Sequence, residues 1–133
     1  MKRRFLAAGT AVALCAVGIV AAPVLAGAPS VPATAKKLSG AEIVALYEGS
    51  TFKFTDFSSD VPNAGTVTFD FKNQISSGEL DGYGHFIRSL KMDGDQICGQ
   101  GGGYTLCRSV YVDGARIYEV DTKGAVRSTL QKQ

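Results

Sequence analysis

The sequence predicts a mainly β fold, either an antiparallel meander or a small half-open barrel, with one short N-terminal helix. Apolar and polar residues alternate over residues 51–55 and 67–71, which is the period of a half-buried strand. Asp93-Gly94 and Asp113-Gly114 each stand between β-prone segments, and this dipeptide favours the tight turn of a hairpin. Strands at such short spacing favour antiparallel pairing over a βαβ arrangement.

A capping box at Ser39 and Glu42 predicts the helix, because these two side chains can satisfy backbone N–H groups at its start. The apolar positions that follow are Ile43, Leu46 and Tyr47. They fall on one face, which we expect to pack on the sheet. Gly49 is expected to end the helix.

The remaining elements are predicted as strands joined by turns. The expected strands are residues 51–55, 67–71, 85–90, 96–98, 104–112, 115–120 and 125–130. The expected turns, besides the two Asp-Gly pairs, are residues 61–65 and Lys123-Gly124. Residues 72–84 are polar and glycine-containing, so they are predicted as a loop that leaves room for a short strand at residues 79–80.

Residues 1–26 have the pattern of a secretory signal peptide. Lys2, Arg3 and Arg4 precede an apolar run over residues 5–20, and small residues lead to a cleavage position after Ala26. Three alternatives stay open: cleavage after Ala35, an uncleaved membrane anchor, and twin-arginine rather than general export.

The signal peptide defines the other parts of the chain. Residues 27–37 contain Pro29 and Pro32 and are predicted as a linker without helix or strand, and residues 38–133 as a single β-rich domain. We expect a periplasmic or secreted bacterial protein that meets the membrane only through the signal segment, if that segment stays uncleaved.

The charge of the predicted mature chain is close to zero. Removing the three basic residues of the signal leaves eleven basic residues against twelve acidic ones. No basic patch then favours nucleic-acid binding, and Lys36-Lys37 is predicted to be a solvated pair.

Two cysteines, Cys98 and Cys107, follow the signal, which itself contains Cys15. An even number of cysteines in an oxidising compartment predicts a disulfide, here across the glycine-rich segment between two neighbouring strands. A structural zinc site would need four ligands, and two cysteines with the single histidine do not supply them. We therefore expect no bound metal or cofactor.

Several segments resemble a family of small, uncharacterised proteobacterial exported proteins classed as a domain of unknown function. They are LSGAEIVALYEGSTFKF, MDGDQIC and LCRSVYVDGARIYEV, with the final turn at Lys123-Gly124. The resemblance implies a leading helix that ends in glycine, then β-strands and a cysteine pair. The chain departs from that family in having no tryptophan, and the resemblance supplies no catalytic residues.

Two further patterns suggest chemistry but have simpler explanations. Asp93 and Asp95 fit turn formation better than calcium binding, because no further acidic residues follow at alternating positions. Residues 99–103 lack the lysine and the helix of a phosphate-binding loop, so they are predicted as a hairpin loop.

No catalytic constellation is evident, so we expect a non-enzymatic binding or structural domain of the cell envelope whose partner is an unknown protein or envelope component. One alternative is a carrier of a small apolar ligand in the concave face of the sheet, because many aromatic residues fall in or beside the predicted strands. Another is an enzyme using His85 with Asp81 or Tyr83.

Overall fold

The structure is a computed structural model that describes residues 27–101 and 103–133. The predicted signal peptide, residues 1–26, lies outside the described residues, and so do its cleavage site and Cys15. In the part of the chain that the structure describes, no helix is long and apolar enough to cross a membrane.

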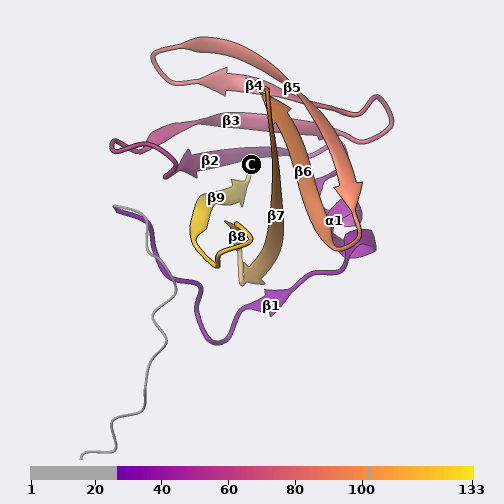
Figure 1. The fold of residues 1–133 in the computed structure, drawn as a ribbon, viewed down its shortest axis with the longest axis vertical. Coiled ribbons are helices and arrows are strands. Elements are labelled where there is room, and N and C mark those ends of the chain that lie inside the picture. Colours follow the sequence, from indigo (N-terminus) through magenta and orange to yellow (C-terminus); the bar gives the residue numbers. More distant parts are fainter. Residues whose placement is uncertain (1–26, 102) are drawn as a thin grey trace, which may run out of the picture.

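Eight antiparallel strands follow one another around a closed barrel (Figure 1). They are β2 (Thr51–Asp56), β3 (Asn63–Asp70), β4 (Ile75–Leu80), β5 (Gly84–Asp93), β6 (Gln96–Gly101), β7 (Tyr104–Asp113), β8 (Arg116–Val120) and β9 (Val126–Lys132). Each strand pairs with the next one in the sequence, and β9 returns to pair with β2. The prediction of a mainly antiparallel β fold is confirmed, and the sheet is closed rather than half open.

Glycines on the inner face allow β3 and β4 to coil tightly enough for closure. A Cβ atom at Gly65 would collide with the carbonyl of Glu79, and one at Gly78 with the carbonyl of Thr66. The backbones of β3 and β4 therefore approach too closely to admit a side chain at these positions. Such inward glycines are typical of the bends that close a small barrel.

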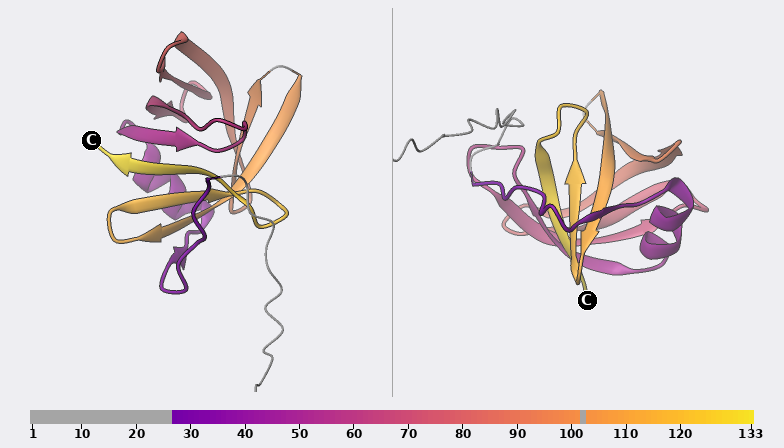
Figure 2. Two further views of the ribbon diagram at one scale, coloured as in Figure 1. Left: turned by 90° about the vertical axis from the view of Figure 1, so that its left-hand side faces the viewer. Right: turned by 90° about the horizontal axis from the view of Figure 1, so that it is seen from below.

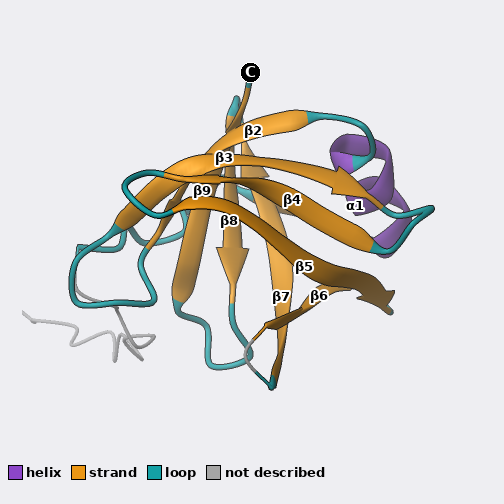
Figure 3. Ribbon diagram, turned by 90° about the horizontal axis from the view of Figure 1, so that it is seen from above, coloured by secondary structure: helices purple, strands orange, loops and turns teal. Residues whose placement is uncertain are grey.

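Helix α1 (Gly40–Tyr47) covers one end of the barrel (Figure 3). Its capping box is formed as predicted, with Ser39 accepting from the backbone N–H of Glu42 and the Glu42 side chain accepting from that of Ser39. The Asp95 side chain, from the β5–β6 turn, accepts a 2.7 Å hydrogen bond from the Gly40 N–H. The helix therefore lies across the ends of the strands and packs on the barrel core through Ile43, Leu46 and Tyr47, the apolar positions predicted for this contact.

The barrel core lies directly beneath this helix. Tyr47, Phe52 and Phe69 form an aromatic cluster with ring centroids 4.5 to 5.8 Å apart. The buried residues around it are Leu38, Ile43, Val67, Leu90, Ile97, Val110, Ile117 and Leu130. We call this end of the barrel, with the β3–β4, β5–β6 and β7–β8 turns, the closed end. The opposite end, with the β2–β3, β4–β5, β6–β7 and β8–β9 turns, is the open end.

The predicted linker is part of the domain, which corrects the expectation that residues 27–37 hold no strand. β1 (Lys36–Lys37) pairs with β7 along the side that β6 leaves free (Figure 1). Ala28 and Val31 pack on the outer face of the barrel against a cluster formed by Tyr118, Val120 and Val126 with Tyr111. The two prolines suggested a linker that packs on nothing. The segment packs on the barrel instead, because β8 and β9 have apolar residues on their outer faces.

The strand boundaries differ from the prediction in other places too. β4 occupies much of the segment predicted as a loop, because Ser76 and Gly78 fill inward positions where the pattern expected large apolar residues. β6 continues to Gly101, so part of the predicted glycine-rich loop is strand. Besides these changes, β3 begins at Asn63, within the turn predicted over residues 61–65.

Candidate ligand-binding cavity

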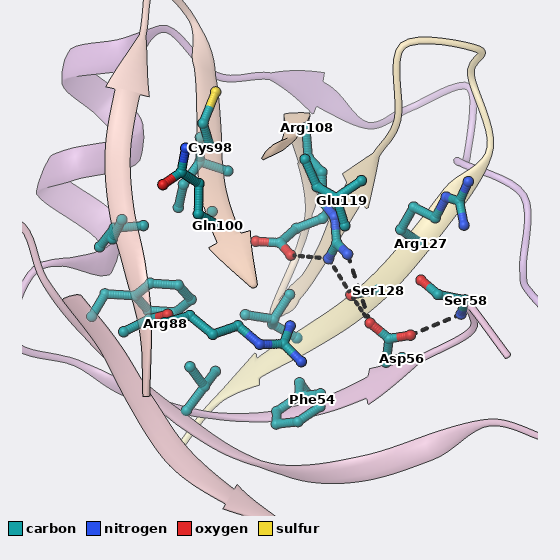
Figure 4. A pocket seen from close by; sticks show the side chains of 18 of the residues that line it. Phe54, Asp56, Ser58, Arg88, Cys98, Gln100, Arg108, Glu119, Arg127 and Ser128 are labelled. Carbon is teal, nitrogen blue, oxygen red and sulfur yellow. Dashed lines mark hydrogen bonds and ion pairs between the residues drawn. The ribbon is translucent and has the colours of Figure 1, made fainter. Parts of the chain in front are cut away.

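The open half of the barrel encloses a cavity of about 600 Å³ (Figure 4). This volume lies within the roughly 300 to 1,000 Å³ typical of small-molecule sites. An eight-stranded barrel has an interior of the size needed either to be filled by side chains or to hold one small ligand. Here the closed half is filled and the open half is not.

One wall of the cavity is incomplete because the β6–β7 hairpin turns away from its neighbours (Figure 2). β6 pairs with β5 almost to its end, as far as Gln100 opposite Ser89, whereas β8 pairs with β7 only from Ser109 onward. Residues 104–108 of β7 thus have no partner on β8. The cavity is open to solvent at this part of β7, where the lining residues Tyr104 and Leu106 are exposed.

The lining is largely apolar and comes from the inward-facing positions of the strands. The apolar lining residues are Phe54, Val67, Phe69, Phe86, Leu90, Ile97, Tyr104, Leu106 and Leu130. Phe54 and Phe86 meet edge to face, with their ring centroids 6.0 Å apart. Phe52 and Phe69 are buried in the core, whereas Tyr104 is 73% exposed and lies at the opening.

A network of buried polar side chains forms the boundary between the filled and hollow halves. Arg108 lies between two carboxylates, 3.1 Å from Glu119 and 3.7 Å from Asp56. The same guanidinium group donates a 2.7 Å hydrogen bond to Ser128, whose hydroxyl donates in turn to Asp56 at 3.3 Å. Every buried side-chain polar atom of the described residues has a hydrogen-bond partner. The network therefore places charges in the barrel without leaving them unpaired.

Tyr47 connects this network to the helix. Its hydroxyl donates a 2.9 Å hydrogen bond to the second oxygen of Glu119, and its side chain is fully buried. Burial raises the pKa of the Tyr47 hydroxyl well above its usual value of 10.0, and the charge of Glu119 adds to the shift. The hydroxyl therefore stays protonated and remains a hydrogen-bond donor to Glu119 at physiological pH.

A β-bulge directs a second arginine to the cavity. Glu119 pairs with Ser128 and Val120 with Val126, so Arg127 is the extra residue on β9, and it lines the cavity together with Ser128. Bulges commonly re-aim a side chain in this way. Arg127 is held by a 2.8 Å ion pair with Asp121 in the β8–β9 turn.

Asp121 also organises the β8–β9 turn. Its other oxygen accepts from the backbone N–H groups of Lys123 and Ala125, both at 2.9 Å. Desolvation opposes ionisation, but these hydrogen bonds and the Arg127 side chain outweigh it and lower the pKa of Asp121 below 3.8.

His85, Asp81 and Tyr83 do not converge on the cavity. His85 alternates with the inward-facing Phe86 and so lies on the outer face of β5, where its side chain is 59% exposed. Its ring nitrogen is 3.2 Å from Glu79, rather than bonded to Asp81 or Tyr83. Among the described residues, His85 therefore forms no hydrogen bond with Asp81 or Tyr83, its partners in the enzyme hypothesis.

The predicted cysteine pair is bridged. Cys98 and Cys107 lie directly opposite each other on β6 and β7 and form a disulfide, with their Cα atoms 4.1 Å apart. Asp93 approaches the two sulfur atoms, but disulfide sulfurs are not thiolates and so offer no metal ligands. Asp95 binds the start of α1 as described, which explains its place in the turn without calcium.

Comparison with known proteins found no match. No family model, curated protein or solved structure matches the chain. The resemblance to the exported-protein family stays a prediction.

Sequence reasoning did not identify the residues of the polar network. A usable signal was present, since Arg108 and Glu119 occupy inward positions on strands whose other inward residues, Val110 and Ile117, are buried. A charge at a core position of a strand indicates either a buried partner or a site. The contacts of Asp56 with Arg108 and Ser128 could not be predicted, because they depend on closure of the barrel, which brings β2 and β9 beside each other.

Proposed function

We propose that this protein is an exported, non-enzymatic binding domain that carries one small, largely apolar molecule inside its barrel. The observation that supports the proposal most strongly is the hollow, apolar-lined open half beneath a wall with a lateral opening. A volume of about 600 Å³ would hold about twenty water molecules at liquid density. Displacing such water from aromatic and aliphatic walls favours an apolar ligand.

The incomplete wall supports a route of entry. The β6–β7 hairpin bears Tyr104 and Leu106 at the opening, 73% and 50% exposed. Large apolar side chains are costly to leave in water, so a ligand that covers them gains additional burial. Export stays part of the proposal, supported by the pattern of residues 1–26 and by the disulfide.

A titration with the neutral apolar dye N-phenyl-1-naphthylamine tests the proposal. We expect saturable binding by the wild-type protein at one site per chain. Gly99→Leu should abolish it, because Gly99 lines the cavity and a Cβ there would meet only the Ser89 carbonyl oxygen, at 3.5 Å. The added side chain would thus occupy the cavity without a backbone collision. Undiminished binding by a folded Gly99→Leu protein, or no saturable binding by the wild type, would contradict the proposal.

Native mass spectrometry of the purified protein gives an independent test. A copurified molecule of defined mass that is absent from Gly99→Leu would identify the ligand.

A protein or envelope partner is the second candidate, and one observation favours it. Of the six large apolar side chains exposed in the described part of the chain, five lie at or near the open end: Val61, Tyr83, Ile87, Tyr104 and Leu106. Exposed apolar groups that gather on one end of a molecule often mark an interaction surface. Affinity capture from envelope extracts with the wild type and a Tyr83→Ser, Tyr104→Ser double variant tests this; a partner retained equally by both proteins would not be bound there.

A further inference from the structure

The ligand-binding cavity contains a cationic side chain that the polar network does not use. Arg88 lies at an inward position of β5, opposite Ser76 of β4 and between Phe86 and Leu90 along the strand. Figure 4 shows its guanidinium group extending into the cavity. Arg88 is exposed to solvent, so it lines the cavity at an open part of its wall and not in the packed core.

The guanidinium group of Arg88 forms no hydrogen bond or ion pair with any described residue. Its one assigned interaction is with the face of the Phe86 ring, whose centroid lies 5.4 Å from its Cζ atom. This contact orients the group but leaves its N–H donors available. By contrast, Arg108 and Arg127, the other two arginines that line the cavity, are each paired with a carboxylate.

The carboxylates of the cavity are already engaged. Asp56 accepts from the Ser58 N–H with one oxygen and interacts with Ser128 and Arg108 through the other. Glu119 accepts from Tyr47 and Arg108. Neither carboxylate is within ion-pair distance of Arg88, so the protein itself does not neutralise that charge.

We propose that Arg88 binds the anionic end of an amphipathic ligand whose apolar part fills the barrel. A ligand that excluded water from the cavity while leaving this guanidinium group unpaired would cost free energy, whereas a carboxylate can accept two parallel hydrogen bonds from it. The ligand class is thus a hydrocarbon or aromatic body with a single carboxylate or similar anionic group at one end. This inference rests on the proposed carrier function and defines its specificity.

Three probes with the same chain and different ends test the proposal: octanoate, 1-octanol and octylamine, each below the concentration at which it forms micelles. Isothermal titration of the wild-type protein should give at least about tenfold tighter binding of octanoate than of octanol, the difference expected of a hydrogen bond to a charged group. Octylamine should bind most weakly.

Variants at Arg88 assign the preference to this side chain. Arg88→Gln should bind octanol as the wild type does and lose the preference for octanoate, and Arg88→Lys should keep part of that preference. Lys91→Gln is the matched control, because it removes a positive charge from the outer face of the same strand.

The outcomes separate the two proposals. Octanol binding without a preference for octanoate, or a full preference retained by Arg88→Gln, would overturn the role of Arg88 while leaving the carrier function in place. Failure of the wild type to bind octanoate and octanol alike would overturn the carrier function and this inference with it.

Discussion

The two ends of the barrel are built from the same strands, yet one end is a packed core and the other is hollow. Along β2 the inward positions change from Phe52, which is 0% exposed, to Asp56 in the polar network. Along β7 they change from Val110, also 0% exposed, to Tyr104 at the opening. Helix α1 accounts for part of the difference, because it supplies the apolar side chains that complete the core at the closed end only.

Closure of the barrel and the presence of a cavity in its open half depend on different features of this fold. Closure depends on pairing of β2 with β9 and on the inward glycines Gly65 and Gly78. The hollow half depends on divergence of the β6–β7 hairpin and on a polar network that holds its own charges. A strand can therefore stabilise the fold at one end and present a site at the other.

The largest expected effect contrasts the two ends directly. Phe52→Ala removes a fully buried ring at the closed end and should lower the free energy of unfolding by about 3 to 5 kcal/mol. Tyr104→Ala removes an exposed ring at the open end and should change it by no more than about 0.5 kcal/mol. Urea denaturation measures both, and similar losses in the two variants would contradict the division into a packed and a hollow half.

Removal of the disulfide between β6 and β7 should also lower the stability of the protein. Cys107→Ala should lower the free energy of unfolding by roughly 2 to 3 kcal/mol, because a closed loop of about ten residues is released in the unfolded state. Cys98→Ala should cost slightly more, since Cys98 is buried and also loses packing. The double variant should be no less stable than Cys98→Ala. Free thiols, labelled under denaturing and non-reducing conditions, would instead show that the bridge is absent.

Tyr47→Phe tests the contact between the two halves. Without the hydroxyl, one oxygen of the buried Glu119 carboxylate loses its hydrogen bond, which should cost about 1 to 3 kcal/mol in the free energy of unfolding. Tyr118→Phe is the control, because Tyr118 is also buried but its hydroxyl makes no hydrogen bond to a described residue. Equal thermal midpoints for the two variants would contradict a stabilising role of the hydrogen bond between Tyr47 and Glu119.

The smallest expected effect concerns the β8–β9 turn at the open end. The folded-state pKa of Asp121 is lowered, so its contribution to stability is present at neutral pH and is lost as the pH falls below about 4. Asp121→Asn should therefore be less stable than the wild type at neutral pH, with the gap narrowing in acid. Asp60→Asn, in the exposed β2–β3 loop, is the control. Thermal midpoints measured across this range would contradict the assignment if the Asp121→Asn gap were independent of pH.

The sequence predicted best the features that depend on residues close together in the chain. The capping box at Ser39 and the Asp-Gly turns predicted their elements correctly, because each depends on contacts between neighbouring residues. Only a short strand at residues 79–80 was anticipated for β4, because Ser76 and Gly78 satisfy the geometry of closure rather than the pattern of a buried strand. A ligand-binding cavity was predicted only as one alternative. It depends on closure of the barrel, which pairs β2 with β9, two strands that are far apart in the sequence.

Because the chain contains no tryptophan, a single introduced indole can report on the cavity without background. Leu106→Trp places it at the opening, and Ile87→Trp places one on the outer face of β5 as a control. On titration with 1-octanol, the account predicts a saturable blue shift of tryptophan emission in Leu106→Trp and no shift in Ile87→Trp. An unchanged spectrum in Leu106→Trp, or equal shifts in the two variants, would contradict the claim that the open half of the barrel is the ligand-binding site.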